Sequence, residues 1–304
     1  MQKTHGRRRL SRRERHDLAA GYLFLTPFLI GLFLFTVYPF VYSLYLSFTD
    51  YDILTKPGWI GIKNYVEMFT NDPKFWLSFR ITCKFALIQV PVKLAFSLLV
   101  AVILSKTTRL TNAYRAAFYI PSLLGGGVAV AMTWKQLWRV DGVVNRLLAP
   151  LGVPAVNWLK NPNTALYILI LLGVWQFGSQ MLIFLAGIKD VPASLHEAAI
   201  VDGAGPVKRF FKVTLPMLTP CLFFNLVNGI IGSMQAFNSA YLVTSGGPVN
   251  STLYFGLYQY RQAFEFRNMG YASAMAWFLM LVIVALTALV FRSSSGWVYY
   301  QDEK

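Results

Sequence analysis

The sequence predicts an all-α polytopic membrane protein with six transmembrane helices. Of its 304 residues, 56% are apolar and only 13% are charged, and the mean hydropathy is +0.48. Soluble domains carry about 25% charged residues, so this composition is typical of a chain that spans a membrane. Six apolar stretches reach the length of about 20 residues that a bilayer requires. They lack the in–out alternation of barrel strands, which leaves helices as the expected spanning structure.

The predicted transmembrane domain covers residues 21–292, between a basic tail at 1–20 and a C-terminal tail at 293–304. Pro121 and the three glycines Gly125, Gly126 and Gly127 weaken the third stretch and predict a hinge or a close-packing point there. The longer stretches are expected to be tilted or broken. In chain order, the six stretches lie at about 21–48, 78–105, 116–138, 164–187, 217–244 and 270–291.

The basic residues favour a cytoplasmic N-terminus. Seven of the 28 Lys and Arg precede residue 16, where they would lie next to anionic lipid headgroups. With this orientation, sixteen basic residues are cytoplasmic and nine are outside, and the C-terminus is also cytoplasmic. The charge of +15 is therefore explained by the membrane, and no nucleic-acid partner is expected. The first stretch is too long for the apolar region of a cleaved signal peptide.

All 13 Asp and Glu and all three His lie outside the six stretches. An ion-coupled secondary sugar carrier needs carboxylates or His near the bilayer midplane, and an enzyme acting on lipid-linked sugar needs a clustered acid, base or metal site. Both alternatives lack their chemistry here, and Asp50, Asp52, Asp72 and Asp141 are expected to be solvated loop residues. There is no phosphate-binding glycine loop followed by Lys. We expect no catalytic residue, metal or cofactor on this chain, so a partner must supply any energy.

Polar side chains follow one face of the fifth predicted helix. Their spacing is i, i+3, i+7, i+10 and i+14, and a cluster with an aromatic ring and amides occupies about one turn of the fourth helix. Either they pack helices through hydrogen bonds, or they line a hydrophilic path. Amides and aromatic rings match the hydroxyls and C–H faces of sugars. The residues involved are Asn225, Asn228, Gly232, Gln235 and Ser239, with Asn238 beside them, and Trp175, Gln176, Ser179 and Gln180. The candidate path residues are Trp175, Gln176, Gln180, Asn225, Asn228, Gln235, Asn238 and Lys93.

Lys93 lies deepest among the three lysines inside the stretches, about 22 Å from the outer end of its helix at 1.5 Å per residue. Lys84 and Lys135 lie near the outer ends and can reach the interface. Lys93 either reaches the cytoplasmic interface, or faces a polar cavity or a partner subunit. If it lines the path, an anionic substrate is favoured.

The segment at 188–216, between the fourth and fifth stretches, is too polar for another span. It contains Glu197-Ala198-Ala199, Gly203, and then Val213-x-Leu215-Pro216. This spacing resembles the EAA motif of permease subunits of binding-protein-dependent ABC importers, with Val213 in place of the usual Ile. Pro192 can begin a short helix, Gly203 permits the positive φ that ends it, and Pro206 can begin a second helix.

Other segments resemble the MalF-like branch of that family, which imports carbohydrates, so the resemblance covers nearly the whole chain. It implies the type I importer permease fold (MalF/MetI-like) with both termini inside. The segments are WIGIKNYVEMF from Trp59, RAAFYIPSLL from Arg115, GVVNRLL from Gly142, TSGGP from Thr244 and GYASA from Gly270.

The resemblance also implies partners and a mechanism. The partners are a second, homologous permease in a heterodimer, two ATPase subunits that bind ATP and Mg, an extracytoplasmic sugar-binding protein and the lipid of a bacterial inner membrane. A sugar would enter by alternating access; a neutral oligosaccharide is the default, and an acidic one of the uronate or alginate type is the alternative. The residues expected to couple the chain to the ATPase are Glu197, Ala198, Ala199, Asp202, Gly203, Ala204, Leu215 and Pro216.

Overall fold

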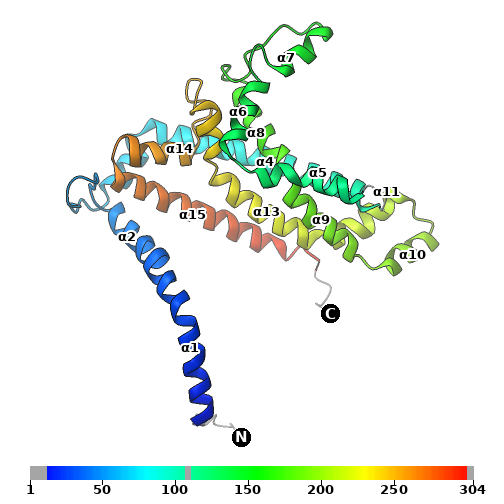
Figure 1. The fold of residues 1–304 in the computed structure, drawn as a ribbon, viewed down its shortest axis with the longest axis horizontal. Coiled ribbons are helices and arrows are strands. Elements are labelled where there is room, and N and C mark those ends of the chain that lie inside the picture. The colour runs from blue at the N-terminus through cyan, green and yellow to red at the C-terminus, as the bar shows by residue number, and fades with distance from the viewer. Residues whose placement is uncertain (1–11, 107–110, 300–304) are drawn as a thin grey trace.

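The computed structural model describes residues 12–106 and 111–299, and within these ranges the ordered elements are helices (Figure 1). One isolated antiparallel bridge joins Thr49 to Trp59. The outermost residues of the two predicted tails, 1–11 and 300–304, lie outside the described residues.

Three helices are long and apolar enough to span a membrane without a break. They are Ala20–Ser47, which combines α1 (Arg12–Leu32), η1 (Phe33–Val37) and α2 (Tyr38–Ser47), then α4 (Pro73–Ser105) and α15 (Met269–Ser294). Helix α4 begins five residues before the predicted stretch at 78–105. Its start is fixed by Asp72, whose Oδ1 accepts hydrogen bonds from the backbone N–H groups of Lys74 (2.9 Å) and Phe75 (3.2 Å).

Three further pairs of helices meet the same length and composition criteria but are sharply bent. The pairs are α5 (Thr111–Leu124) with α6 (Val128–Leu137) at 104°, α8 (Ala165–Trp175) with α9 (Gly178–Asp190) at 44°, and the helical segment Pro206–Met217 with α13 (Thr219–Met234) at 64°. Helix α5 continues through Pro121, so the break of the third stretch lies at the glycines, where Gly125 has φ +58°.

The fifth stretch is not one helix over 217–244. Helix α13 ends at Met234, Gln235–Phe237 are not helical, and η4 (Ala240–Thr244) follows. A single continuous helix face for the polar stripe is therefore wrong. The remaining short elements are α3 (Lys63–Thr70), α7 (Val143–Leu148), η2 (Ala149–Leu151), α10 (Ala193–Val201), α11 (Pro206–Arg209), η3 (Phe210–Thr214), α12 (Leu215–Met217), α14 (Phe255–Tyr260) and η5 (Arg261–Glu265).

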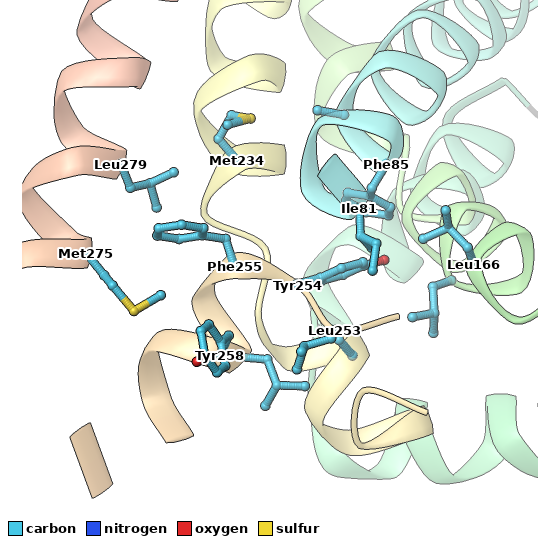
Figure 2. Close-up of a cluster of buried hydrophobic side chains, with 14 of the residues drawn as sticks. Ile81, Phe85, Leu166, Met234, Leu253, Tyr254, Phe255, Tyr258, Met275 and Leu279 are labelled. Carbon is cyan, nitrogen blue, oxygen red and sulfur yellow. The ribbon is translucent and has the colours of Figure 1, made fainter. Parts of the chain in front are cut away.

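Helix α4 is the centre of the packing. Its N-terminal half contacts the start of α14, where the ring of Phe85 lies 4.6 Å from that of Tyr254 (Figure 2). The ring of Phe75 lies 5.6 Å from Phe255 of α14 and 5.0 Å from Phe278 of α15. The C-terminal half of α4 packs against α9, where Phe184 is fully buried. Lipid is as apolar as these side chains, so close dispersion contacts stabilise the bundle more than the hydrophobic effect does.

The first spanning helix is the bare helix of this chain: its side chains are not covered by other helices along most of its length. It projects away from the other helices (Figure 1), and no side chain from Ala20 to Leu46 is buried. Its C-terminal part is attached to α15, where the ring of Phe40 lies 4.7 Å from that of Trp277. The rest of its apolar surface is free to contact lipid or another membrane chain.

Candidate functional site

A cavity of about 360 Å³ lies where the three bent helix pairs meet α4. Three helix breaks contribute to its wall: Gly126 and Gly127 from the third stretch, Gln176 from the fourth, and Gln235 from the fifth. The 64° bend between Met217 and Thr219 lies outside the lining. A break in a helix exposes backbone polar groups, which a membrane tolerates only inside protein or beside a water-filled cavity. The broken helices are therefore tolerated in a membrane because their free backbone groups lie beside the cavity.

Seven amide side chains line this cavity: Gln89, Gln176, Gln180, Asn225, Asn228, Gln235 and Asn238. Some of them repair the broken helices. The Gln176 amide donates to the carbonyl of Gly125 (3.0 Å), which has lost its helical partner at the bend. Asn225 donates weakly to the carbonyl of Gln180 (3.4 Å), and Ser233 donates to Oε1 of Gln89 (2.6 Å).

The structure brings most of the predicted path residues together. Gln176, Gln180, Asn225, Asn228, Gln235, Asn238 and Lys93 all line the cavity, and so do Gly232 and Ser239 of the polar stripe. Trp175 is not in the lining, because its ring packs against Trp134 with 5.9 Å between centroids. Gln89 was missed by the sequence analysis. Its signal was available, since an amide four residues before Lys93 shares a helix face with that lysine.

Lys93 carries the single formal charge among the described residues that line the cavity. It is half-buried, and within 12–106 and 111–299 the structure gives its ammonium group no carboxylate partner. Gln180 also has an unpaired group, because its Oε1 is buried and receives no hydrogen bond from the described residues. The wall therefore offers one cation, one unpaired acceptor and several amides to whatever enters.

The segment at 188–216 forms the expected helix-turn-helix. Helix α10 begins at Ala193, and Pro192 is its N-cap residue. The helix therefore begins one residue later than it would if Pro192 were its first helical residue. Gly203 has φ +74° and ends the helix, while the amide of Ala204 donates to the carbonyl of Ala199 (2.9 Å). Helix α11 then starts at Pro206.

Apolar and acidic side chains of this helix-turn-helix face outward. Val201 is 87% exposed and Val207 is 69% exposed. Glu197 and Asp202 are exposed, and no ion pair is formed by either of them in the described part of the chain. An exposed apolar surface rimmed by charges is typical of a protein interaction site. Leu215 and Pro216 are instead half-buried in α12, next to the 64° bend into α13.

Asp72 joins the three helices α4, α14 and α15. Its Oδ2 accepts hydrogen bonds from the phenols of Tyr258 (2.7 Å) and Tyr271 (2.6 Å), while its Oδ1 caps α4. Burial and then this hydrogen bond raise the pKa of Tyr258, so the phenol remains a donor. The expectation that Asp72 is a solvated loop residue is therefore wrong.

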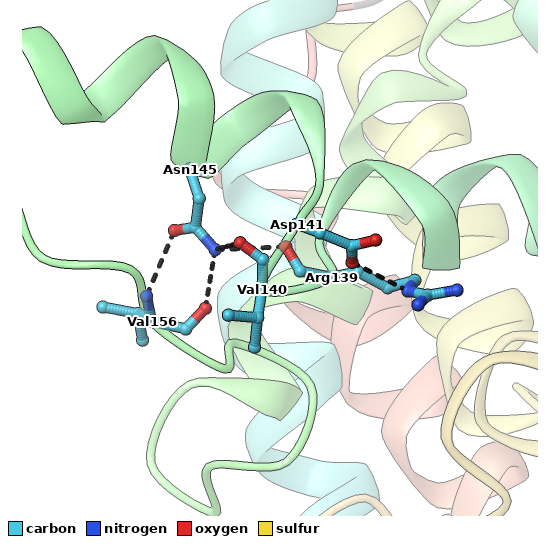
Figure 3. A network of polar contacts seen from close by, with 5 residues as sticks. All are labelled: Arg139, Val140, Asp141, Asn145 and Val156. Carbon is cyan, nitrogen blue, oxygen red and sulfur yellow. Dashed lines mark hydrogen bonds and ion pairs between the residues drawn. The ribbon is translucent and has the colours of Figure 1, made fainter.

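The loop that follows α6 is organised by Asn145. Its side-chain amide donates to the carbonyls of Arg139 (3.1 Å), Val140 (3.1 Å) and Val156 (2.8 Å), and its Oδ1 accepts from the backbone of Val156 (Figure 3). Arg139 pairs with Asp141 at 3.0 Å on the surface. These bonds give a fixed shape to a loop that is otherwise irregular.

Residues 16–300 match the family described as "Binding-protein-dependent transport system inner membrane component". The chain is 50% identical over 297 residues to the probable ABC transporter permease protein YesP of Bacillus subtilis, covering 97% of this chain and 96% of that protein. It is 32% identical over 282 residues to the lactose transport system permease protein LacF of Rhizobium radiobacter, covering 90% and 93%.

A solved structure shares the fold. One chain of a bacterial alginate ABC transporter, crystallised in complex with an alginate pentasaccharide-bound periplasmic protein, superimposes with a TM-score of 0.83. The match covers 94% of this chain and 97% of that chain, at 22% sequence identity.

Proposed function

This chain belongs to the family of binding-protein-dependent transport system inner membrane components, and from that premise we propose that it is the permease subunit of an ATP-driven importer of a sugar or oligosaccharide. Its relatives are transport components, so it catalyses no covalent reaction. Substrate would cross by alternating access to the amide-lined cavity. Transport would run from an extracytoplasmic binding protein into the cytoplasm of a bacterium.

The amide-lined cavity carries the proposal. Sugars present many hydroxyl donors and acceptors, and seven amides in one wall provide both kinds of group without fixed charge. The cavity also lies at the helix breaks, where small rotations of the bent segments would open it to one side or the other. An ion-coupled carrier is the less favoured function, because no carboxylate or His belongs to the described lining.

The energy would come from ATPase subunits that bind ATP and Mg. We assign their docking to the helix-turn-helix, with Glu197, Ala198, Ala199, Asp202, Gly203 and Ala204 at the contact. The exposed valines would enter a cleft of the ATPase, and the small alanines would let the helix backbone approach closely. Leu215 and Pro216, at the bend into α13, would transmit the movement to the helix that lines the cavity.

A second, homologous permease would complete the pathway. The bare first helix supports this, because a membrane partner would cover the apolar surface that this chain leaves unpaired. An extracytoplasmic binding protein would dock on the opposite end from the helix-turn-helix. The solved alginate transporter, which has this fold, was crystallised with such a protein.

Co-purification tests the ATPase docking site. We expect the tagged chain, expressed with its neighbouring importer genes, to retain an ATPase subunit in detergent. Val201→Glu should remove that subunit, because it introduces a charge into an apolar contact. Val249→Glu is the matched control, since Val249 is equally exposed (87%) but lies in the predicted outer loop. Equal retention by Val201→Glu and the wild-type chain would contradict the assignment of the docking site.

A further inference from the structure

Lys93 is placed where a structural role does not explain it. Its half-buried ammonium lies in the cavity wall among amides and apolar groups, and the described lining contains no carboxylate to balance the charge. A charged group in a low-dielectric site is costly unless it is paired. A cavity for neutral sugars alone could be built from the amides, and the half-exposed ammonium of Lys93 is available to a partner that enters from outside the chain.

Gln180 supplies a second open position in the same wall. Its Oε1 is buried and accepts no hydrogen bond within the part of the chain that the structure describes, while its backbone carbonyl accepts one from Asn225. A buried acceptor without a donor is destabilising, so a ligand hydroxyl that donates to it is favoured. The cavity wall would therefore bind a ligand that places an anionic acceptor at Lys93 and a hydroxyl donor at Gln180.

A second pocket, of about 270 Å³, is also lined by cations without a carboxylate among the described lining residues. Helix α6 lines the first cavity with its N-terminal residues and the second pocket with Lys135 near its C-terminal end. Asn238 and Ser239, directly before η4, line the first cavity, and Val243 and Thr244 at the end of η4 line the second pocket. Lys135, Arg139 and Lys160 line the second pocket beside Trp138, and the described lining contains no carboxylate. Asp141, outside this lining, pairs with Arg139 on the surface. Several cations around one pocket attract anions, and an aromatic ring can pack against the face of a sugar.

We propose that the substrate is an oligosaccharide that carries carboxylate groups, and that Lys93 is the residue that binds one of these carboxylates inside the cavity. This inference rests on the proposed function and names the substrate class of the same cavity. Hydroxyl groups of a uronate would donate to Gln180 and accept from the other amides. Lys135, Arg139 and Lys160 would concentrate the anion at the second pocket before it reaches Lys93.

The test uses the complete importer in liposomes, with the same binding protein throughout. The probes are short oligosaccharides of mannuronate, guluronate, galacturonate and glucuronate, each paired with its carboxyl-reduced, neutral counterpart. Lys93→Met should slow ATP-driven uptake of the acidic probe by about 10-fold or more, because a charge-assisted hydrogen bond is lost. Lys93→Arg should retain most of that uptake.

Lys84→Met is the control. Lys84 lies on the same helix, but its ammonium group sits 5.3 Å from the ring centroid of Tyr167 and is not in the cavity lining. We expect this variant to import the acidic probe at the wild-type rate. Co-purification of the second permease should also be unaffected by Lys93→Met.

Three results would overturn the inference while leaving the importer function intact. One is ATP-driven uptake of neutral sugars with no uptake of any acidic probe, and another is equal loss of acidic and neutral uptake in Lys93→Met. The third is loss of the second permease from Lys93→Met, which would place the lysine at a subunit interface. Absence of ATP-driven uptake for every sugar would instead contradict the proposed function itself.

Discussion

Gln176 and Asp72 show how single polar side chains stabilise this chain at the points where its helices begin or break. Gln176 donates to the carbonyl that the bend at Gly125 leaves without a helical partner, so one amide repairs the backbone of another span. Asp72 accepts two backbone bonds at the start of α4 and two phenol bonds from α14 and α15. Burying either side chain in lipid would cost free energy, and the hydrogen bonds given above reduce that cost here.

Asp72→Ala should lower the free energy of unfolding by about 2–4 kcal/mol, through loss of the α4 cap and of the acceptor for two partly buried phenols. Unfolding in detergent micelles at rising SDS concentration measures this. Asp141→Ala is the control, because its single exposed ion pair with Arg139 contributes at most about 1 kcal/mol. Equal destabilisation by the two changes would show that the Asp72 network has no special role.

At the scale of elements, we expect the turn between α10 and α11 to control how the helix-turn-helix moves α13. Gly203 holds φ +74°, which a proline ring cannot adopt, and its amide donates to the carbonyl of Ile200 (3.0 Å). Gly203→Pro should therefore distort the turn and abolish ATP-driven uptake without preventing membrane insertion. Uptake assays on membranes containing equal amounts of each variant provide the measurement.

Gly205→Pro is the matched control for that turn. Gly205 has φ −64°, which is the value that proline fixes, so the same substitution two residues later should leave uptake largely intact. Wild-type uptake by Gly203→Pro, or equal loss in both variants, would contradict a specific role for the turn.

Local signals in the sequence predicted some elements well and others not at all. Gly203 and Pro206 determine the helix-turn-helix because their backbone preferences act on neighbouring residues. The breaks at Gln176 and Gln235 could not be predicted, because they depend on contacts such as Gln176 with Gly125, 51 residues away. The residues of the polar stripe nevertheless share one cavity, since polar groups on both sides of the break avoid lipid.

The candidate site was predicted from its composition more than from its geometry. Amides in apolar stretches indicated the cavity wall. Among the candidate path residues only Trp175 lies outside the lining, against Trp134. The role of Asp72 was not accessible, because its tyrosine partners lie 186 and 199 residues further along the chain. Such pairings appear only once the helices are packed.

At the scale of the whole molecule, the chain leaves two apolar surfaces exposed. Its first spanning helix buries no side chain between Ala20 and Leu46, and its helix-turn-helix exposes apolar residues away from the bundle. The cavity is lined from one side by this chain's own breaks. These surfaces are explained together if a second permease covers the bare helix and an ATPase covers the helix-turn-helix.

Solute accumulation by purified protein in liposomes tests this account most directly. We predict that the chain reconstituted with its second permease, ATPases and binding protein accumulates sugar against a gradient only when ATP is supplied, and that the chain by itself accumulates none. Uphill accumulation by the isolated chain, driven by an ion gradient in the absence of nucleotide, would contradict the account.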